Sequence, residues 1–195
     1  MRLFALDASF SFINLAVLKD GELELLHYLK TEKKTLELLP SLLRELGLRP
    51  EDFDAYAVSV GAGYLTSLRI SVTQVKLWAY TNKKPLVPFE NLELMLRFTP
   101  VPLPRVAYLK VSRHYFYRTF DGKTLSPVKL YEGEKLEGYG ITIKGHEGEL
   151  TKELFVHPFF PFSAYGAVYA DEFLKREPKG VDPLKVEPVY VKPPA

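Results

Sequence analysis

Residues 54–80, DAYAVSVGAGYLTSLRISVTQVKLWAY, decide how this chain folds. Small and apolar residues at positions 55–60 predict a buried strand, which leads into a turn that contains Gly61 and Gly63. The apolar spacing after the turn predicts a helix over residues 66–80. A glycine-rich turn that leads into a helix N-terminus is a common phosphate-binding arrangement, because its backbone N–H groups face the anion.

The turn lacks most of the side chains of a phosphate site. Gly61 and Gly63 are followed by Tyr64 and Leu65, whereas a P-loop continues with Lys and then Ser or Thr. Asp7 closes the first apolar strand, but no second carboxylate at a strand end would complete a metal centre. We interpret the glycines as a tight turn and Asp7 as a turn cap. A vestigial nucleotide site made of Asp7, Gly61 and Gly63 is the alternative.

The composition narrows the class of protein. The chain has 195 residues, a formal net charge of +2 and no cysteine, so disulfides, thiolate catalysis and cysteine metal sites are excluded. The small net charge does not by itself indicate a nucleic-acid-binding protein. No apolar run approaches the roughly 18 residues of a membrane span, and we expect a soluble cytoplasmic protein that does not bind membranes.

The first half of the chain has the element order of an RNase-H-like lobe. Three strands joined by hairpins are followed by helix, strand, helix, strand and helix, which predicts a mixed sheet flanked by helices. The expected strands are residues 2–6, 11–18, 22–29, 55–60 and 85–87, and the expected helices are residues 35–46, 66–80 and 90–97.

Prolines at positions 100, 102 and 104 indicate a domain boundary. After them, strands are expected at residues 105–111, 115–120, 124–131 and 139–144, and a helix at residues 162–175. We therefore predict two domains, an N-terminal lobe at residues 1–99 and a smaller C-terminal lobe at residues 100–195. The two lobes could share one fold.

The two long helices of the first lobe carry more apolar surface than one core needs. At about 100° per residue, Leu68, Val72 and Val75 share one stripe of the second helix, while Ile70 and Leu77 lie opposite. The leucines of the first helix also spread widely around it. The two helices either bury these side chains against each other or form a protein–protein interface. The candidate interface residues are Leu38, Leu42, Leu46, Ile70, Leu77 and Trp78.

No catalytic or metal-binding motif stands out elsewhere. The four histidines, His27, His114, His146 and His157, have no HxxxH spacing, so we predict no metal site, no catalytic residue and no cofactor. Basic and aromatic residues alternate between positions 105 and 118, which fits either a half-buried strand pair or an RNA-facing surface.

Several segments of the chain resemble the bacterial TsaB family, also called YeaZ. The family patterns ILAIDTS, HxxxLLP, GPGSFTGLRIG, AKGLA, PLVGVSSLEAL and EPxYLR correspond in order to residues 3–9, 34–40, 61–71, 75–79, 85–94 and 187–192. The chain departs from the patterns at several positions and resembles a divergent member. The departures are Lys34, Ala62, Tyr64, Leu65, Ser67 and Ser71.

The resemblance implies a fold and a function. The fold is that of the actin, sugar-kinase and heat-shock-chaperone ATPase superfamily, with two RNase-H-like lobes. The function is a non-catalytic scaffold or activating subunit for threonylcarbamoylation of adenosine 37 in tRNA. Its partners would be a TsaD-like paralogue, docked on the N-lobe helices, and a TsaE-like ATPase, with a homodimer when alone and tRNA reached through the complex. The alternatives are a small ATP-binding, kinase-like enzyme and an RNA-binding module.

Overall fold

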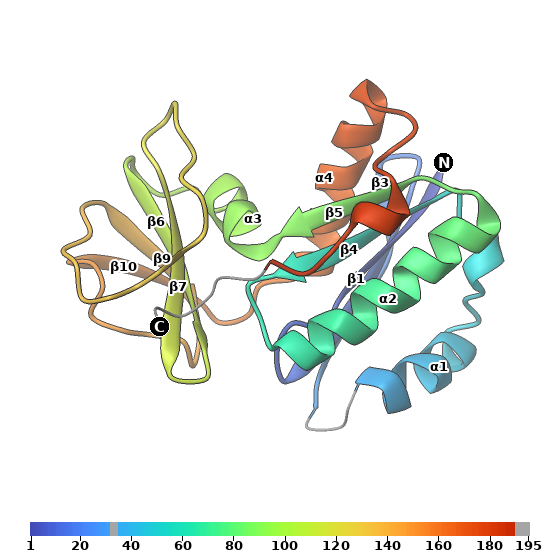
Figure 1. Cartoon of the computed structure of the whole chain (residues 1–195), viewed down its shortest axis with the longest axis horizontal. Helices are drawn as coiled ribbons and strands as arrows, with labels where there is room; N and C mark the ends of the chain where they lie inside the picture. The colour runs from blue at the N-terminus through green and yellow to red at the C-terminus, as the bar shows by residue number, and fades with distance from the viewer. Residues whose placement is uncertain (32–34, 190–195) are drawn as a thin grey trace. The chain divides into compact units, whose positions relative to one another are not determined.

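The computed structural model describes residues 1–31 and 35–189, and these residues form two compact units (Figure 1). The first unit combines Met1–Phe89 with Pro161–Pro188, and the second contains Glu90–Phe160 and Val189. The chain therefore leaves the first unit ten residues earlier than the predicted boundary after residue 99, and it returns to that unit for its last helix.

The first unit is built on a mixed five-stranded sheet. Its strands are β1 (Arg2–Asp7), β2 (Phe12–Lys19), β3 (Glu22–Lys30), β4 (Ala55–Gly61) and β5 (Leu86–Glu90), in the order β3-β2-β1-β4-β5. β1 pairs antiparallel with β2, which pairs antiparallel with β3, and β4 runs parallel to β1 on its other side. This is the predicted meander extended by a parallel strand through a helical crossover.

Helices cover this sheet because its central strands are apolar on both faces. β1, β2 and β4 are buried along almost their whole length. α2 (Leu65–Asn82) packs on β4 and β1, and α4 (Phe162–Arg176) packs on β2, β1 and β4. α1 (Thr35–Glu45) packs against α2. Two 3₁₀ turns, η1 (Pro50–Asp52) and η2 (Pro183–Lys185), also pack against α2.

The second unit repeats the strand order of the first. Its strands are β6 (Arg105–Val111), β7 (His114–Phe120), β8 (Lys129–Leu130), β9 (Tyr139–Ile143) and β10 (Glu153–His157). Their order is β10-β9-β6-β7-β8, with β6, β7 and β8 antiparallel and β9 parallel to both β6 and β10. α3 (Asn91–Phe98) packs on β6 and β7. The predicted pair of RNase-H-like lobes is confirmed, although loops replace the crossover helices of the second.

Three local predictions were wrong. The helix predicted at residues 66–80 begins one residue earlier, at Leu65, with Tyr64 as its N-cap, because the Tyr64 carbonyl already accepts from the Leu68 amide at 3.0 Å. The strand predicted at residues 124–131 shortens to Lys129–Leu130, and β10 was not expected. Both errors concern the edges of the second sheet, where pairing with a distant strand decides the outcome and local pattern does not.

Candidate functional site

One face of α2 supplies core side chains to the first unit. Leu68, Val72, Val75 and Ala79 are at most 2% exposed, which confirms the predicted stripe. Ser71 lies on the same face and satisfies its buried hydroxyl by donating to the backbone carbonyls of Ser67 and Leu68 at 3.0 and 3.1 Å. This face is fully used within the chain.

The outer side of α2 is mixed in polarity, and two of its apolar side chains lie open. Leu77 is 53% exposed and Tyr80 is 63% exposed, whereas Ile70 is half-buried. Trp78 is partly buried, and its ring lies 5.8 Å from that of Phe4 and 6.4 Å from that of Tyr56. Leu77 is thus the predicted interface residue that is most available to another molecule, while Trp78 also braces the sheet.

The first helix contributes less open surface than its leucine content indicates. Leu39, Leu42 and Leu43 are buried, and Leu38 and Leu46 are partly exposed. Leu42 therefore belongs to the chain's own core. For this candidate interface residue, burial within the chain applies instead of an interface with another protein. The motif residue Lys34 lies outside the described residues, as do Tyr190, Val191 and Lys192 of the C-terminal motif.

A C-terminal segment with an exposed leucine packs beside α2. Lys76 Nζ donates to the carbonyl of Val186 at 2.7 Å and to that of Leu184 at 3.4 Å, which fixes η2 against the helix. Leu184 is 68% exposed. We call Leu77, Tyr80 and Leu184 the α2–η2 patch. Leu184 could not be predicted from the sequence, because a proline-rich tail carries no signal of where it packs.

The structure brings the three residues of the predicted nucleotide site together. Asp7 ends β1 and Gly61 ends the neighbouring parallel strand β4, while Gly63 lies directly on Ser9 in the turn after β1. A Cβ built on Gly63 would stand 2.5 Å from the Ser9 Cβ and 2.6 Å from the Ser9 carbonyl oxygen. Glycine is required here for close packing within the chain.

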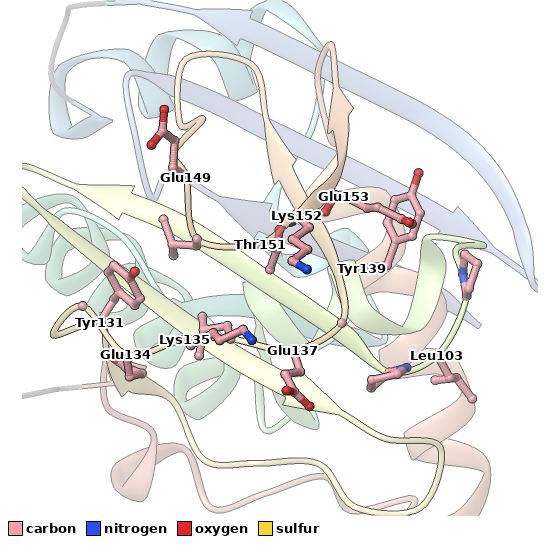
Figure 2. A pocket seen from close by; sticks show the side chains of 16 residues that line it. Leu103, Tyr131, Glu134, Lys135, Glu137, Tyr139, Glu149, Thr151, Lys152 and Glu153 are labelled. Atoms are coloured by element: carbon pink, nitrogen blue, oxygen red, sulfur yellow. Dashed lines mark hydrogen bonds between the residues drawn. The ribbon is translucent and has the colours of Figure 1, made fainter.

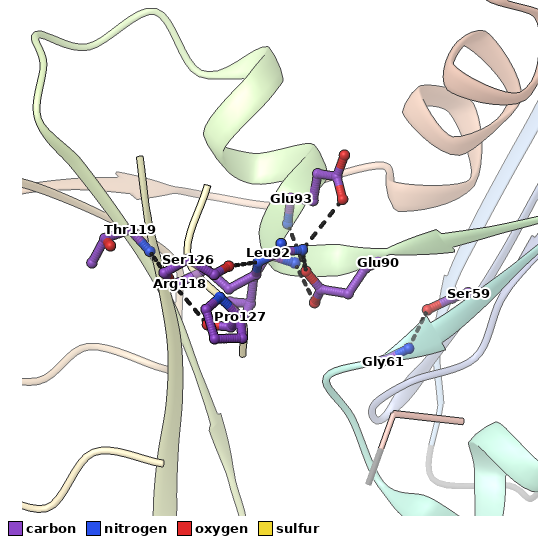
Figure 3. Close-up of polar contacts among 9 residues, drawn as sticks. All are labelled: Ser59, Gly61, Glu90, Leu92, Glu93, Arg118, Thr119, Ser126 and Pro127. Atoms are coloured by element: carbon purple, nitrogen blue, oxygen red, sulfur yellow. Dashed lines mark hydrogen bonds and ion pairs between the residues drawn. The ribbon is translucent and has the colours of Figure 1, made fainter. Parts of the chain in front are cut away.

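Backbone donors of this turn already have acceptors in the chain. The Tyr64 amide donates to the Ser9 carbonyl at 2.7 Å, and the Gly61 amide donates to Ser59 Oγ at 3.3 Å (Figure 3). A phosphate bound at the turn would have to replace these bonds. The local geometry thus favours a tight structural turn over a phosphate cradle.

Asp7 is the centre of a buried polar network in the first unit. Its carboxylate is fully buried and accepts from the Ser9 amide at 3.2 Å, from Ser9 Oγ, and from Asn14 Nδ2 at 3.0 Å. Burial raises the pKa of Asp7, and these hydrogen bonds oppose the rise. Asn14 Oδ1 accepts from the Ser163 amide at 2.8 Å, so the network ties β1 and β2 to the first turn of α4.

Two arginines of the candidate RNA-facing strands donate hydrogen bonds within the second unit. Arg118 donates to Glu90 at 3.1 Å, to Glu93 at 3.2 Å and to the Ser126 carbonyl at 2.7 Å (Figure 3). Arg105 donates to backbone carbonyls at the end of α3 and just beyond it. The aromatic partners Tyr108 and Tyr117 are buried in the core of this unit.

The remaining cations of that set lie at the β6–β7 hairpin. Lys110, Arg113 and His114 are exposed there, whereas the neighbouring Tyr115 and Phe116 are half-buried, and the Tyr115 ring lies 5.7 Å from Lys110 Nζ. The pattern that suggested RNA binding is mostly the alternation of a half-buried strand pair.

The second unit also contains an open pocket of about 680 Å³ that the sequence did not indicate (Figure 2). Three proline-rich loop residues at positions 102–104 and two loops, residues 131–139 and 149–153, line it. Glu134 is already engaged, because Tyr117 Oη and the Glu132 amide donate to its carboxylate at 2.6 and 2.7 Å. The pocket mixes Glu and Lys side chains without a convergent set of ligands.

Among residues 1–31 and 35–189, no group of three or more His, Asp or Glu side chains is arranged to hold a metal ion. Within the same residues, no helix has the length and apolar character needed to cross a membrane.

Comparisons with known proteins point to one group. A family model described as TsaD, tRNA N6-adenosine threonylcarbamoyltransferase, matches residues 30–109. The tRNA N6-adenosine threonylcarbamoyltransferase of Pediococcus pentosaceus is 25% identical over 136 residues, which cover 57% of this chain and 39% of that protein. The chain therefore spans about two fifths of the length of this curated relative.

Solved structures of YeaZ proteins resemble the whole chain. YeaZ from Pseudomonas aeruginosa is 20% identical, with a TM-score of 0.75 over 97% of this chain and 99% of that chain. A protein described as similar to peptidase YEAZ from Pseudomonas aeruginosa is 19% identical, with a TM-score of 0.74 over 98% of this chain and 99% of that chain. The predicted resemblance to the YeaZ proteins is confirmed at the level of the fold.

Proposed function

We propose that this chain is a TsaB-like subunit of a tRNA-modifying complex, one that takes part in threonylcarbamoylation of adenosine 37 without catalysing it. In this proposal the outer face of α1 and α2 docks on a TsaD-like partner, and a TsaE-like ATPase joins the pair. The partner supplies the metal and the substrates, and the docked unit holds the partner in an active arrangement. When the TsaD-like partner is missing, the same face of α1 and α2 binds a second copy of the chain.

The observation that carries the proposal is the exposed apolar surface of α2. A helix that packs only on its own sheet is expected to be polar on its outer face. Instead, Leu77 and Tyr80 are each more than half exposed, and the exposed Leu184 lies in η2, which Lys76 ties to the same helix. Isolated apolar side chains are common on surfaces, but a cluster on one helix face is typical of an interaction site.

Two observations support a subunit without catalytic machinery of its own. The four histidines have no spacing that would place two of them on one helix face as metal ligands. Asp7, the one carboxylate at the end of a central strand, is buried and hydrogen-bonded to Ser9 and Asn14. The ATP-binding alternative would need this carboxylate and the Gly61–Gly63 turn to face a ligand.

The likeness to YeaZ is consistent with this assignment. It extends over nearly the whole of both chains, whereas the likeness to the transferase covers about two fifths of that protein. A match of one part of the chain to the TsaD model fits a paralogue that shares the RNase-H-like lobe of its partner.

Co-purification with a TsaD-like protein tests the proposal. Leu77→Glu places a carboxylate in the α2–η2 patch and should abolish co-purification while leaving the circular dichroism spectrum unchanged. Leu103→Glu is the matched control, because Leu103 is 51% exposed, close to the 53% of Leu77, and lies in the second unit. Equal loss of binding in both variants, or none in either, would count against α2 as the docking surface.

Calorimetry separates the proposal from the ATP-binding alternative. The wild-type chain titrated with ATP and Mg²⁺ should show no binding at micromolar concentrations. Micromolar binding that Asp7→Asn removes would favour the kinase-like enzyme instead.

A further inference from the structure

β10 leaves one edge of the second sheet open. The order β10-β9-β6-β7-β8 places it last, and among residues 1–31 and 35–189 no strand pairs with its outer side. Its sequence, ELFVH, contains no proline, glycine or lysine, and its register with β9 is continuous. Proline, lysine and bulges are the usual means of blocking strand pairing at an edge, and β10 has none of them.

The strand at the equivalent position in the first sheet has a covered edge. β5 lies beside β4 at the end of that sheet, as β10 lies beside β9. Val181 forms an antiparallel bridge with Leu86 of β5, and its amide donates to the Leu86 carbonyl at 2.9 Å. Gly180 lies so close that a Cβ there would stand 2.6 Å from the Leu86 carbonyl oxygen. An extended segment thus covers this edge in the first unit, and no described strand does so in the second.

Two aromatic side chains lie open at the uncovered edge. Phe155, in the middle of β10, is 40% exposed, and Phe159, just beyond the strand, is 55% exposed. Leu86, on the covered edge of the first sheet, is fully buried. Exposed apolar side chains that are grouped within one short segment are typical of an interaction site.

Contacts within the second unit hold β10 in place behind Phe155. The His157 ring lies 4.8 Å from the Phe155 ring and 4.9 Å from the Phe160 ring. His157 Nε2 is hydrogen-bonded to Thr99 Oγ1, at the C-cap of α3, at 2.8 Å. Because the strand is already fixed in an extended conformation, a partner segment would pair with it without the cost of ordering it.

The pocket beside the first residue of β10 has an excess of carboxylates. Glu153 belongs both to the strand and to the pocket lining (Figure 2). The other charged residues of the lining are Glu134, Glu137, Glu149, Lys135 and Lys152. A segment antiparallel to β10 brings its C-terminal end to Glu153, where this charge balance favours basic side chains and opposes the phosphates of a nucleic acid.

We infer that β10 binds an extended apolar segment of a partner protein by antiparallel strand addition, and that Lys or Arg follows the apolar residues of this segment. The backbone of the segment pairs with the outer edge of β10, and its side chains cover Phe155 and Phe159. The basic end faces the carboxylates of the pocket. The site lies in the second unit and includes no residue of the α2–η2 patch, so the inference is independent of the proposed function.

A fluorescein-labelled peptide, Thr-Val-Thr-Val-Thr-Arg-Arg, tests strand addition by fluorescence anisotropy. We expect a dissociation constant below about 1 mM, and Phe155→Ala should raise it about tenfold. Leu26→Ala is the matched control and should not change it, because Leu26 is 39% exposed and lies on β3, an edge strand of the first sheet. Absence of binding at about 1 mM, or equal weakening in both variants, would overturn the inference.

Changes in the peptide test how it is oriented. Alternate residues of a paired strand direct their N–H groups to opposite edges. Of two peptides N-methylated at the odd or at the even positions, one should therefore lose binding and the other should keep it. A peptide with both arginines placed first should bind about tenfold more weakly. Equal affinity for the two arginine positions would contradict the antiparallel arrangement.

Amide hydrogen exchange locates the bound peptide. Saturating peptide should slow exchange in Glu153–His157 and leave exchange in β3 and α2 unchanged. Protection of β3 in place of β10 would overturn the inference. So would protection of β10 that rises with protein concentration in the absence of peptide, since a second copy would then be the occupant. Leu77→Glu should leave peptide binding unchanged, which separates this site from the proposed docking of α2.

Discussion

Gly63 lies against Ser9 so closely that no side chain fits between them. A Cβ on Gly63 would stand 2.5 Å from the Ser9 Cβ, and the Tyr64 amide donates to the Ser9 carbonyl at 2.7 Å. The turn that resembles a phosphate loop in the sequence is thus closed by the turn after β1. It joins the ends of two parallel strands and sets where α2 begins.

Replacement of Gly63 by alanine should destabilise the first unit. The added methyl group has to displace the Ser9 backbone, and overpacking of this kind costs about 1–3 kcal/mol. Urea unfolding measures the loss. Gly47→Ala serves as the control, because nothing lies within 4 Å of a Cβ there and only its φ of +64° opposes the change. A cost at Gly63 below that at Gly47 would contradict the close packing.

Replacement of Arg118 by alanine should destabilise the second unit by about 3 kcal/mol or more. Arg118 forms ion pairs with both Glu90 and Glu93. Glu90 is buried and is the N-cap of α3, so removal of Arg118 leaves a buried carboxylate without its cation. Arg113→Ala, at the exposed β6–β7 hairpin, should change the unfolding free energy by less than about 0.5 kcal/mol. Similar effects in the two variants would show that the Arg118 cluster has no structural role.

Acid should weaken the second unit through His146. Burial lowers the pKa of His146 to about 4, and its Nδ1 accepts from the Lys110 amide at 3.0 Å. A histidine with a depressed folded pKa binds a proton more readily when unfolded, so stability is lost as the pH falls below the unfolded pKa. Between about pH 7 and about pH 5 the expected loss is about 2 kcal/mol.

His146→Asn isolates this contribution, because the asparagine oxygen can accept from the Lys110 amide without titrating. Other groups also contribute to the pH dependence of the wild-type unfolding free energy. Burial lowers the pKa of His157, which acts in the same direction as His146. Burial raises the pKa values of Asp7 and Glu90, which act in the opposite direction. The relevant quantity is therefore the difference between wild type and variant in urea unfolding. An identical pH dependence for the two proteins would refute the prediction.

Local patterns were sufficient to predict the helices and strands of the first 99 residues. The hairpin at Asp20 and Gly21, the apolar strand before Gly61 and the amphipathic spacing of α2 each act over a few residues, and each predicted element formed. The placement of α4 could not be predicted, because its packing on the first sheet depends on contacts made more than a hundred residues away, such as that of Asn14 with Ser163.

The candidate site was predictable in outline only. The helical period identified Leu77 as an outward side chain, but it could not show that Leu42 is consumed by the core or that Leu184 lies beside α2. Asp7 and Gly63 were grouped only as an alternative nucleotide site, and their roles in packing and in the polar network depend on Ser9 and Asn14, which carry no motif of their own.

The central claim is that this chain activates a partner by docking through α2. Threonylcarbamoylation of tRNA by a TsaD-like protein, a TsaE-like protein and increasing amounts of this chain tests it most directly. We expect wild type and Leu103→Glu to support the reaction equally, and Leu77→Glu to require a concentration about a hundredfold higher, since lost affinity is offset by mass action. Transfer by the chain alone, or equal activity of Leu77→Glu at every concentration, would contradict the account.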